Sequence, residues 1–210
     1  MAAADRVNGW LRKVPAWPLY VLGAVPPLWL FWLGAADRLG VDPVKAVEHR
    51  LGLWGLWLLI AVLCITPLRR YAGVNLLKYR RAIGLLAFFY ILLHLAAWLV
   101  LDMGLLLGQA LGDIAKRPYI TIGMAALVLM VPLALTSNNL SVRRLGAAGW
   151  RRLHLLTYPA ALLGALHFAV QTKTWQARPL TYLAIVVALL ALRLAWTRAA
   201  LPLLQRRSGA

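Results

Sequence analysis

The chain has 210 residues, of which 62% are hydrophobic and only 14% are charged. A soluble domain carries about 45–50% apolar and about 25% charged residues, so this composition excludes an ordinary soluble domain and a disordered chain. The single cysteine, Cys64, excludes an intrachain disulfide and a CxxC metal site. An integral membrane protein remains, and at this length we expect no separate soluble catalytic domain.

Six stretches of the chain are almost free of charged residues and long enough to cross a membrane. A bilayer core of about 30 Å needs about 20 residues of helix, and backbone groups in lipid must bond within their own segment. The stretches cover residues 14–36, 51–68, 82–101, 118–142, 153–172 and 179–197, the last broken only by Arg193. The sequence therefore predicts an all-α membrane protein, a bundle of six transmembrane helices.

The basic residues give this bundle a direction. Most of the 23 lysines and arginines fall at the N-terminus, in the second-to-third and fourth-to-fifth loops, and at the C-terminal end. Because cytoplasmic loops carry the excess of Lys and Arg, we predict that both termini are cytoplasmic. The net charge of +17 is then explained by topology and by contact with anionic membrane lipid, without nucleic acid as a partner.

The chain is predicted to divide into three parts. Residues 1–13 form a cytoplasmic N-terminal tail, residues 14–198 the six-helix domain, and residues 199–210 a basic cytoplasmic C-terminal tail. The spans hold no carboxylates, which an ion transporter would normally need at membrane depth. A P-loop, a dinucleotide-binding glycine motif and a serine nucleophile elbow are also absent from the sequence.

Three of the four histidines lie inside predicted spans, where ionisable side chains are costly and indicate functional sites. By the helical rise, His94 lies about 18 Å and His167 about 21 Å from the cytoplasmic end of its span. Two imidazoles at similar depth on parallel helices could hold a haem iron from both sides. For either histidine alone, a hydrogen bond between helices is an equally good explanation.

His154 and the small residues near these histidines leave alternatives open. His154 lies about 20 Å nearer the cytoplasm than His167, with no histidine level with it on the third span. It could bind a second haem, line a flavin or quinone site, or be structural. Small residues leave room for a flat macrocycle, and equally favour close helix packing. They are Gly84, Ala87, Ala160, Ala161 and Gly164.

A set of residues in fixed order matches a known family over most of the chain. The set comprises Asp42, Pro43, Glu48, Gly52, Thr66, Pro67, Leu68, Arg69, Arg70, Arg80, Arg81, Gly84, His94, Lys116, Arg117, Pro118, Tyr119, Leu135, Thr136, Ser137, Trp150, Leu153, His154, Tyr158 and His167. In these residues the chain resembles the MsrQ (YedZ) family. Its members are haem-binding membrane subunits of the bacterial periplasmic methionine sulfoxide reductase system, within the ferric-reductase-like transmembrane group.

This resemblance implies cofactors, partners and a place in the cell. It implies haem b, with His94 and His167 as the axial pair and His154 as a third family histidine, and it also implies FMN. Electrons would pass from the quinone pool or a cytoplasmic flavin reductase across the inner membrane to a periplasmic molybdenum-cofactor enzyme that reduces methionine sulfoxide. The chain itself would be an electron-transfer subunit without substrate chemistry of its own.

Two other functions remain as alternatives. The first is a haem-free membrane assembly or transport protein, whose histidines only link helices. The second is a cytochrome b subunit that serves a different reductase. For the MsrQ-like interpretation, the loops opposite the cytoplasmic side, including residues 42–43 and 116–119, are the expected docking surface for a periplasmic partner.

Overall fold

The structure is a computed structural model, and it describes residues 2–171 and 176–208, with side chains for residues 4–171 and 176–196. Throughout these ranges the regular elements are helices and helical turns. They are α1 (Ala2–Lys13), α2 (Pro18–Ala35), α3 (Pro43–Tyr71), η1 (Leu77–Tyr79), α4 (Arg80–Ala97), η2 (Trp98–Asp102), α5 (Leu107–Lys116), α6 (Pro118–Leu135), α7 (Asn139–Leu153), η3 (His154–Leu156), α8 (Thr157–Val170) and α9 (Ala177–Ser208). The predicted all-α fold is confirmed.

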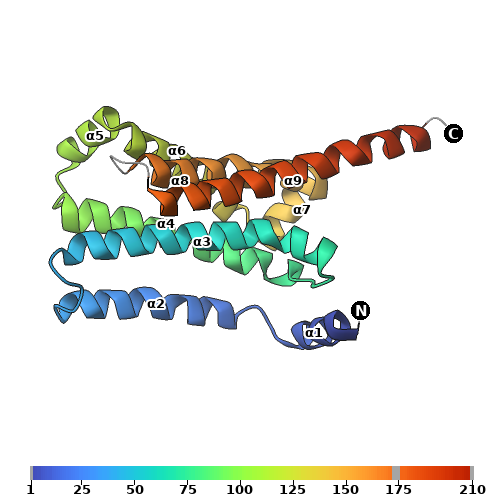
Figure 1. Ribbon diagram of the computed structural model, residues 1–210, viewed down its shortest axis with the longest axis horizontal. Helices are drawn as coiled ribbons and strands as arrows, with labels where there is room; N and C mark the ends of the chain where they lie inside the picture. The colour runs from blue at the N-terminus through green and yellow to red at the C-terminus, as the bar shows by residue number, and fades with distance from the viewer. Residues whose placement is uncertain (1, 172–175, 209–210) are drawn as a thin grey trace.

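Six segments of the described chain are long and apolar enough to span a membrane. They are Pro18–Ala35, Pro43–Tyr71, Leu77–Asp102, Pro118–Leu135, Asn139–Val170 and Ala177–Trp196. Their number and order agree with the six predicted spans, and the chain is a multi-pass membrane protein. The long helices run side by side, so that α1 and the last turns of α9 lie at the same end of the bundle (Figure 1).

The predicted fourth span, 118–142, is wrong at its C-terminal end. α6 ends at Leu135, and α7 begins a new helix in a different direction. The Asn138 side chain accepts a hydrogen bond from the Ser141 amide at 2.8 Å, which caps α7. Polar residues that cap helices start a new helix more readily than they extend an old one. The end of the predicted fifth span, residue 172, lies outside the described residues.

The second span begins earlier than predicted, because α3 starts at Pro43 and includes the charged residues that precede residue 51. Pro43 is its first residue, and the Asp42 carboxylate accepts from the Lys45 amide at 2.9 Å. Proline at the first helical position after an Asp cap is a favoured helix start. The Lys45 ammonium lies 2.8 Å from the Asp102 carboxylate at the end of the third span, so this charge is paired.

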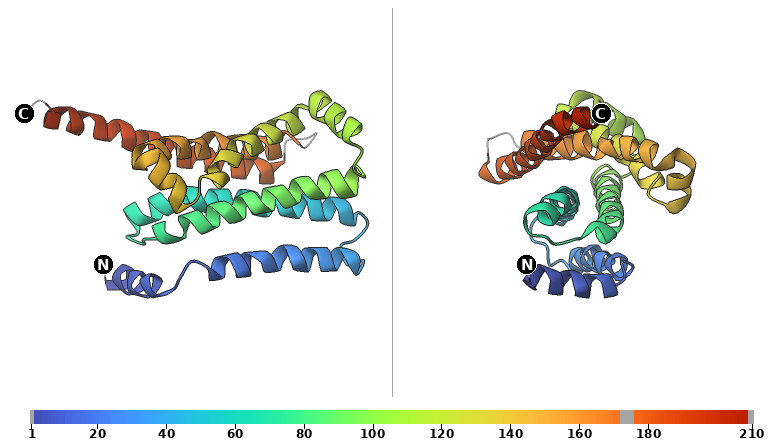
Figure 2. Two further views of the ribbon diagram at one scale, coloured as in Figure 1. Left: turned by 180° about the vertical axis from the view of Figure 1, so that it is seen from behind. Right: turned by 90° about the vertical axis from the view of Figure 1, so that its right-hand side faces the viewer.

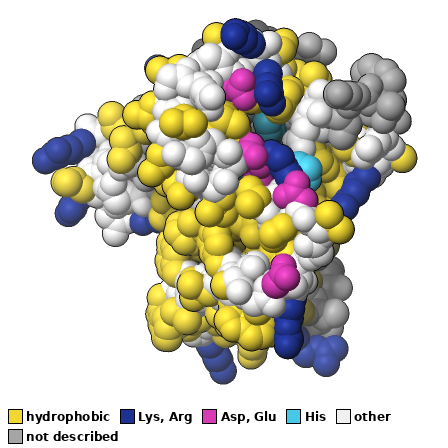
Figure 3. Space-filling view, turned by 90° about the vertical axis from the view of Figure 1, so that its left-hand side faces the viewer, with side chains coloured by type: hydrophobic (Ala, Val, Ile, Leu, Met, Phe, Trp, Pro, Cys, Tyr) yellow, Lys and Arg dark blue, Asp and Glu magenta, His cyan; other side chains and the backbone are white. Residues whose placement is uncertain are grey.

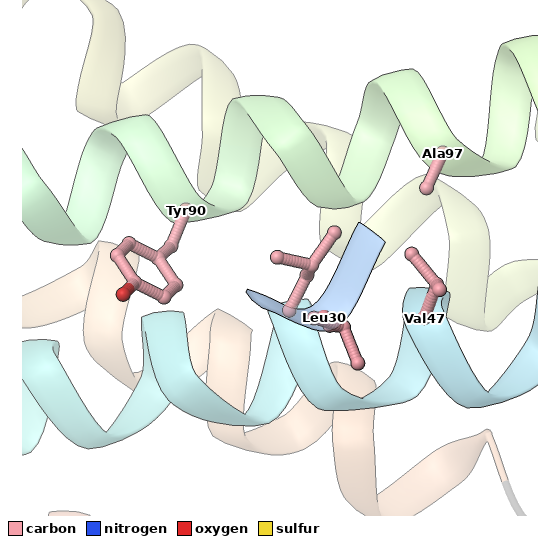
Figure 4. Close-up of a cluster of buried hydrophobic side chains, with 5 residues drawn as sticks. Leu30, Val47, Tyr90 and Ala97 are labelled. Carbon is pink, nitrogen blue, oxygen red and sulfur yellow. The ribbon is translucent and has the colours of Figure 1, made fainter. Parts of the chain in front are cut away.

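The helices form three layers, with α3 and α4 in the middle. α1 and α2 lie on one side of them, and α6, α8 and α9 on the other (Figure 2). Leu30 of α2 inserts between the middle helices, against Val47, Tyr90 and Ala97 (Figure 4). The Tyr90 hydroxyl also donates to the carbonyl of Gly23 in α2 at 2.7 Å, so α2 is held by apolar contact and by one polar bond.

Candidate cofactor site

A cavity of about 460 Å³ lies between α3, α4, α6 and α8. Residues at the start of α6 line it, so it lies toward the end of the bundle near α5, which we call the α5 end. The opposite end, near α1, is the α1 end (Figure 1). Its deeper wall is apolar and includes Leu56, Leu59, Ile91, Leu127 and Met130. Cofactor sites in proteins have about this size and this apolar lining, with a few polar groups that fix the orientation of the ligand.

His94 and His167 face each other across this cavity. His94 comes from α4 and His167 from α8, and their ring centroids are 6.2 Å apart with the ring planes at 69°. Two imidazoles that bind one metal ion through facing nitrogens, at about 2 Å each, have centroids roughly 6 Å apart. The structure therefore brings together the two histidines that the helical rise placed at similar depth, at a spacing that suits one shared ion.

The second nitrogen of each ring is bonded to backbone. The Nδ1 atom of His94 lies 2.8 Å from the Glu48 carbonyl oxygen, and that of His167 lies 2.7 Å from the Tyr119 carbonyl oxygen. Because a carbonyl oxygen only accepts hydrogen bonds, each Nδ1 carries the proton and donates it. Both Nε2 atoms are then left with a lone pair for a metal ion, as in histidine ligands generally.

The donor set of two imidazoles fits a metal ion that is held in a planar macrocycle. Among the residues that the structure describes, no three His, Cys, Asp or Glu side chains form a group that could hold a metal ion. Two axial imidazoles suffice only when a planar ligand supplies the other bonds, as in haem. Of the small residues singled out in the sequence, Ala160 and Gly164 line the cavity.

Charged side chains of both signs surround the mouth of the cavity at the α5 end, where histidine is visible from outside (Figure 3). Lys45 pairs with Glu48 and Asp102, and Arg117 pairs with Asp113 at 3.2 Å. Two effects raise the pKa of Arg117: its hydrogen bond to the Tyr119 hydroxyl and the negative charge of the Asp113 carboxylate. The mouth thus offers fixed charges next to a mainly apolar cavity.

The fourth histidine, His49, also lines the mouth of this cavity. Its imidazole is exposed near the start of α3. It accepts a hydrogen bond from the Gln171 amide at 2.9 Å. This bond links the start of α3 to the end of α8 beside the cavity, and the sequence gives no signal for it.

His154 does not join the other two histidines. It lies in η3 at the α1 end and stacks on Trp150 with ring centroids 3.8 Å apart. Its Nε2 atom lies 3.1 Å from the Thr136 hydroxyl, which donates its own proton to the Pro132 carbonyl at 2.6 Å. His154 must therefore donate from Nε2, which makes this nitrogen unsuitable as a metal ligand in the arrangement seen.

Arg193, the charged residue inside the sixth span, replaces a backbone hydrogen bond that α3 lacks at Pro67. Its guanidinium donates to the Tyr158 hydroxyl at 2.7 Å, to the Thr66 hydroxyl at 2.9 Å and to the Leu63 carbonyl at 3.1 Å. Pro67 in α3 has no amide proton for the Leu63 carbonyl, four residues earlier. A neighbouring helix can satisfy a carbonyl freed in this way inside a membrane, and Arg193 supplies that donor.

Comparison with known proteins gives the same class as the architecture. Residues 51–165 match the family model described as ferric reductase like transmembrane component. Six spans around a cavity with two facing imidazoles define a membrane protein of this ferric-reductase-like class.

The comparison with curated proteins identifies the family within this class. The chain is similar to the protein-methionine-sulfoxide reductase heme-binding subunit MsrQ of Brucella ovis, Brucella canis and Brucella suis. Identity to each is 53% over 196 residues, which cover 92% of this chain and 89% of the relative. The chain belongs to the MsrQ family, and the resemblance found in its sequence is confirmed.

Proposed function

We propose that this protein is a haem b-containing electron-transfer subunit of a methionine sulfoxide reductase system, with His94 and His167 as axial ligands. The observation that carries the proposal is the pair of imidazoles 6.2 Å apart across the cavity. Relatives named as heme-binding subunits support it. Haem, when bound, supplies a one-electron carrier. The protein holds both imidazoles in the tautomer that leaves Nε2 free, and the deeper wall of the cavity is apolar.

The distribution of charge along the bundle supports the direction of electron flow in this proposal. The acidic residues other than Asp5 lie in the loops and helix ends near the α5 end, and the basic excess lies near the α1 end. The positive-inside rule then places the α1 end in the cytoplasm and the cavity toward the periplasm. Electrons would enter at the α1 end from the quinone pool or a cytoplasmic flavin reductase. They would leave at the α5 end to a periplasmic molybdenum-cofactor enzyme.

The haem-free alternative does not explain the cavity. Histidines that only link helices would bond directly or be surrounded by packed side chains, whereas these two leave about 460 Å³ between four helices. FMN enters the proposal through the family resemblance alone. The hydrogen bond of His154 to Thr136 and its stacking on Trp150 favour a structural role for this histidine over a second haem.

Absorption spectra of single histidine variants test the proposal. Protein purified from haem-replete cells should show a dithionite-reduced b-type spectrum, and His94→Ala and His167→Ala should each lose it. His49→Ala is the matched control, because this exposed histidine lies at the cavity mouth without facing the other two. Colourless wild-type protein, or full haem content in both axial variants, would overturn the proposal. Partial haem loss in His154→Ala would instead indicate a second haem.

A further inference from the structure

Both cavity histidines reach the neighbouring helix in the same way. The His94 ring donates to the carbonyl of Glu48 in α3, and the His167 ring donates to the carbonyl of Tyr119 in α6. In each of these helices a glycine follows four residues later, Gly52 in α3 and Gly123 in α6. In an α-helix the carbonyl of one residue accepts the amide of the residue four later, so the glycine is the helical partner of the same carbonyl.

The missing side chain of each glycine is what admits the imidazole. A Cβ atom on Gly52 would lie 3.1 Å from Nδ1 and 3.2 Å from Cε1 of His94. A Cβ atom on Gly123 would lie 2.8 Å from Nδ1 and 3.0 Å from Cε1 of His167. Distances below 3.0 Å do not occur for real Cβ atoms, and a planar ring held at Nδ1 has no flexible end that could move aside. An added methyl group at Gly123 would therefore displace the His167 ring, and one at Gly52 would require the His94 ring to shift by a few tenths of an ångström.

Other helical glycines do not show this arrangement. The Cβ of an alanine at Gly84, in the same helix as His94, would meet nothing within 4 Å. At Gly55 it would meet the flexible end of Ile91, which can rotate away. In each helix pair, one glycine lies four residues after the carbonyl that accepts the histidine's hydrogen bond. This arrangement occurs once for each axial histidine, which distinguishes it from ordinary close packing of helices.

We propose that Gly52 and Gly123 are positioning residues for the axial ligands, and that they set the reduction potential of the haem. This inference rests on the proposed function. A hydrogen bond from Nδ1 to a carbonyl increases the basicity of the ligating nitrogen. A more basic ligand favours the ferric over the ferrous state, because the ferric iron carries the higher charge. The two glycine gaps therefore lower the potential by allowing both bonds to form at full strength.

Alanine substitutions test this role by redox titration and by electron paramagnetic resonance of the ferric haem. We expect Gly52→Ala and Gly123→Ala to raise the midpoint potential and to shift the g-values of the low-spin signal. The shift should be larger for Gly123→Ala, since its Cβ contact is shorter. Gly84→Ala is the matched control and should leave both readouts at the wild-type values. Wild-type potentials and g-values in both variants, or an equal shift in Gly84→Ala, would overturn the inference.

A measurement on the wild-type protein covers the case in which an alanine variant is produced without haem. Pulsed electron paramagnetic resonance detects the remote Nδ1 nitrogen of an axial imidazole, and its quadrupole coupling reports the hydrogen bond at Nδ1. For both rings we expect a quadrupole coupling typical of a strong hydrogen bond to a carbonyl. The coupling should not change when the detergent or the salt concentration is changed. A coupling typical of an unbonded imidazole would overturn the inference while leaving the haem itself, and the proposed function, in place.

Discussion

The two ends of the bundle hold ionisable side chains for opposite purposes. At the α5 end, His94 and His167 each use one ring nitrogen for a backbone carbonyl and turn the other toward a cavity. At the α1 end, His154 and Arg193 bond to hydroxyls, a carbonyl and an aromatic ring, and neither lines that cavity. An ionisable group within a span indicates a ligand site when one of its atoms faces a cavity, and a structural role when its polar atoms are bonded to neighbouring side chains and backbone.

Substitution of the histidines should have the largest effect on haem content, and this effect should differ most clearly between the two ends of the bundle. His94→Ala and His167→Ala are expected to lose nearly all bound haem b, because a single axial imidazole cannot hold the iron from both sides. His154→Ala should keep the haem content of the wild type. The pyridine haemochrome assay per mole of protein measures this directly. Equal haem loss in all three variants would remove the distinction between the two ends.

Arg193 should matter for stability but not for haem content. Arg193→Met removes three hydrogen bonds and leaves the Leu63 carbonyl unsatisfied, which should cost about 1–3 kcal/mol of unfolding free energy. Pro67→Ala is the matched partner, because it restores an amide proton for the Leu63 carbonyl.

A double-mutant cycle on these two residues tests the repair of α3. The cost of Arg193→Met should fall by about 1 kcal/mol in the Pro67→Ala background. Thermal unfolding in detergent provides the stabilities, and reduced spectra provide the haem content. Strict additivity of the two substitutions would show that Arg193 does not replace the donor that Pro67 lacks.

A smaller effect on stability is expected at Thr136, whose hydroxyl accepts the hydrogen bond from His154. Thr136→Val removes this acceptor and should lower the unfolding free energy by about 0.5–1.5 kcal/mol, with unchanged haem content. Ser137→Ala is a close control, because the Ser137 hydroxyl donates to the Leu133 carbonyl at 2.7 Å without contact to the histidine. If Thr136→Val loses haem and Ser137→Ala does not, His154 has a ligand role after all.

The smallest effect is expected at the mouth of the cavity. The Lys45 side chain is 42% exposed and pairs with Glu48 and Asp102, and exposed ion pairs contribute at most about 1 kcal/mol. Lys45→Ala should therefore leave haem content unchanged and lower stability slightly, with the difference reduced at high salt. Marked haem loss in this variant would show that the lysine holds the cofactor itself.

Much of the fold could be predicted because the relevant signals are local in the sequence. Apolar length identified all six spans, and the fixed rise of a helix placed His94 and His167 at similar depth. The end of the predicted fourth span was wrong, because Asn138 caps a new helix, which hydropathy does not detect. The sequence also pointed to Gly84, where an added Cβ would meet nothing within 4 Å, and did not single out Gly123, where it would meet the His167 ring.

The sequence by itself determined the membrane class, the number of spans, the family and the depth of each histidine, since these follow from composition, segment length and residue order. Only the tertiary structure decided which way each side chain points around its helix. The packing of neighbouring helices fixes that rotation, and a small change in it turns an imidazole from a cavity to a packed interface. For this reason His167 and His154, on one predicted span, lie in surroundings as different as a cofactor cavity and an aromatic stack.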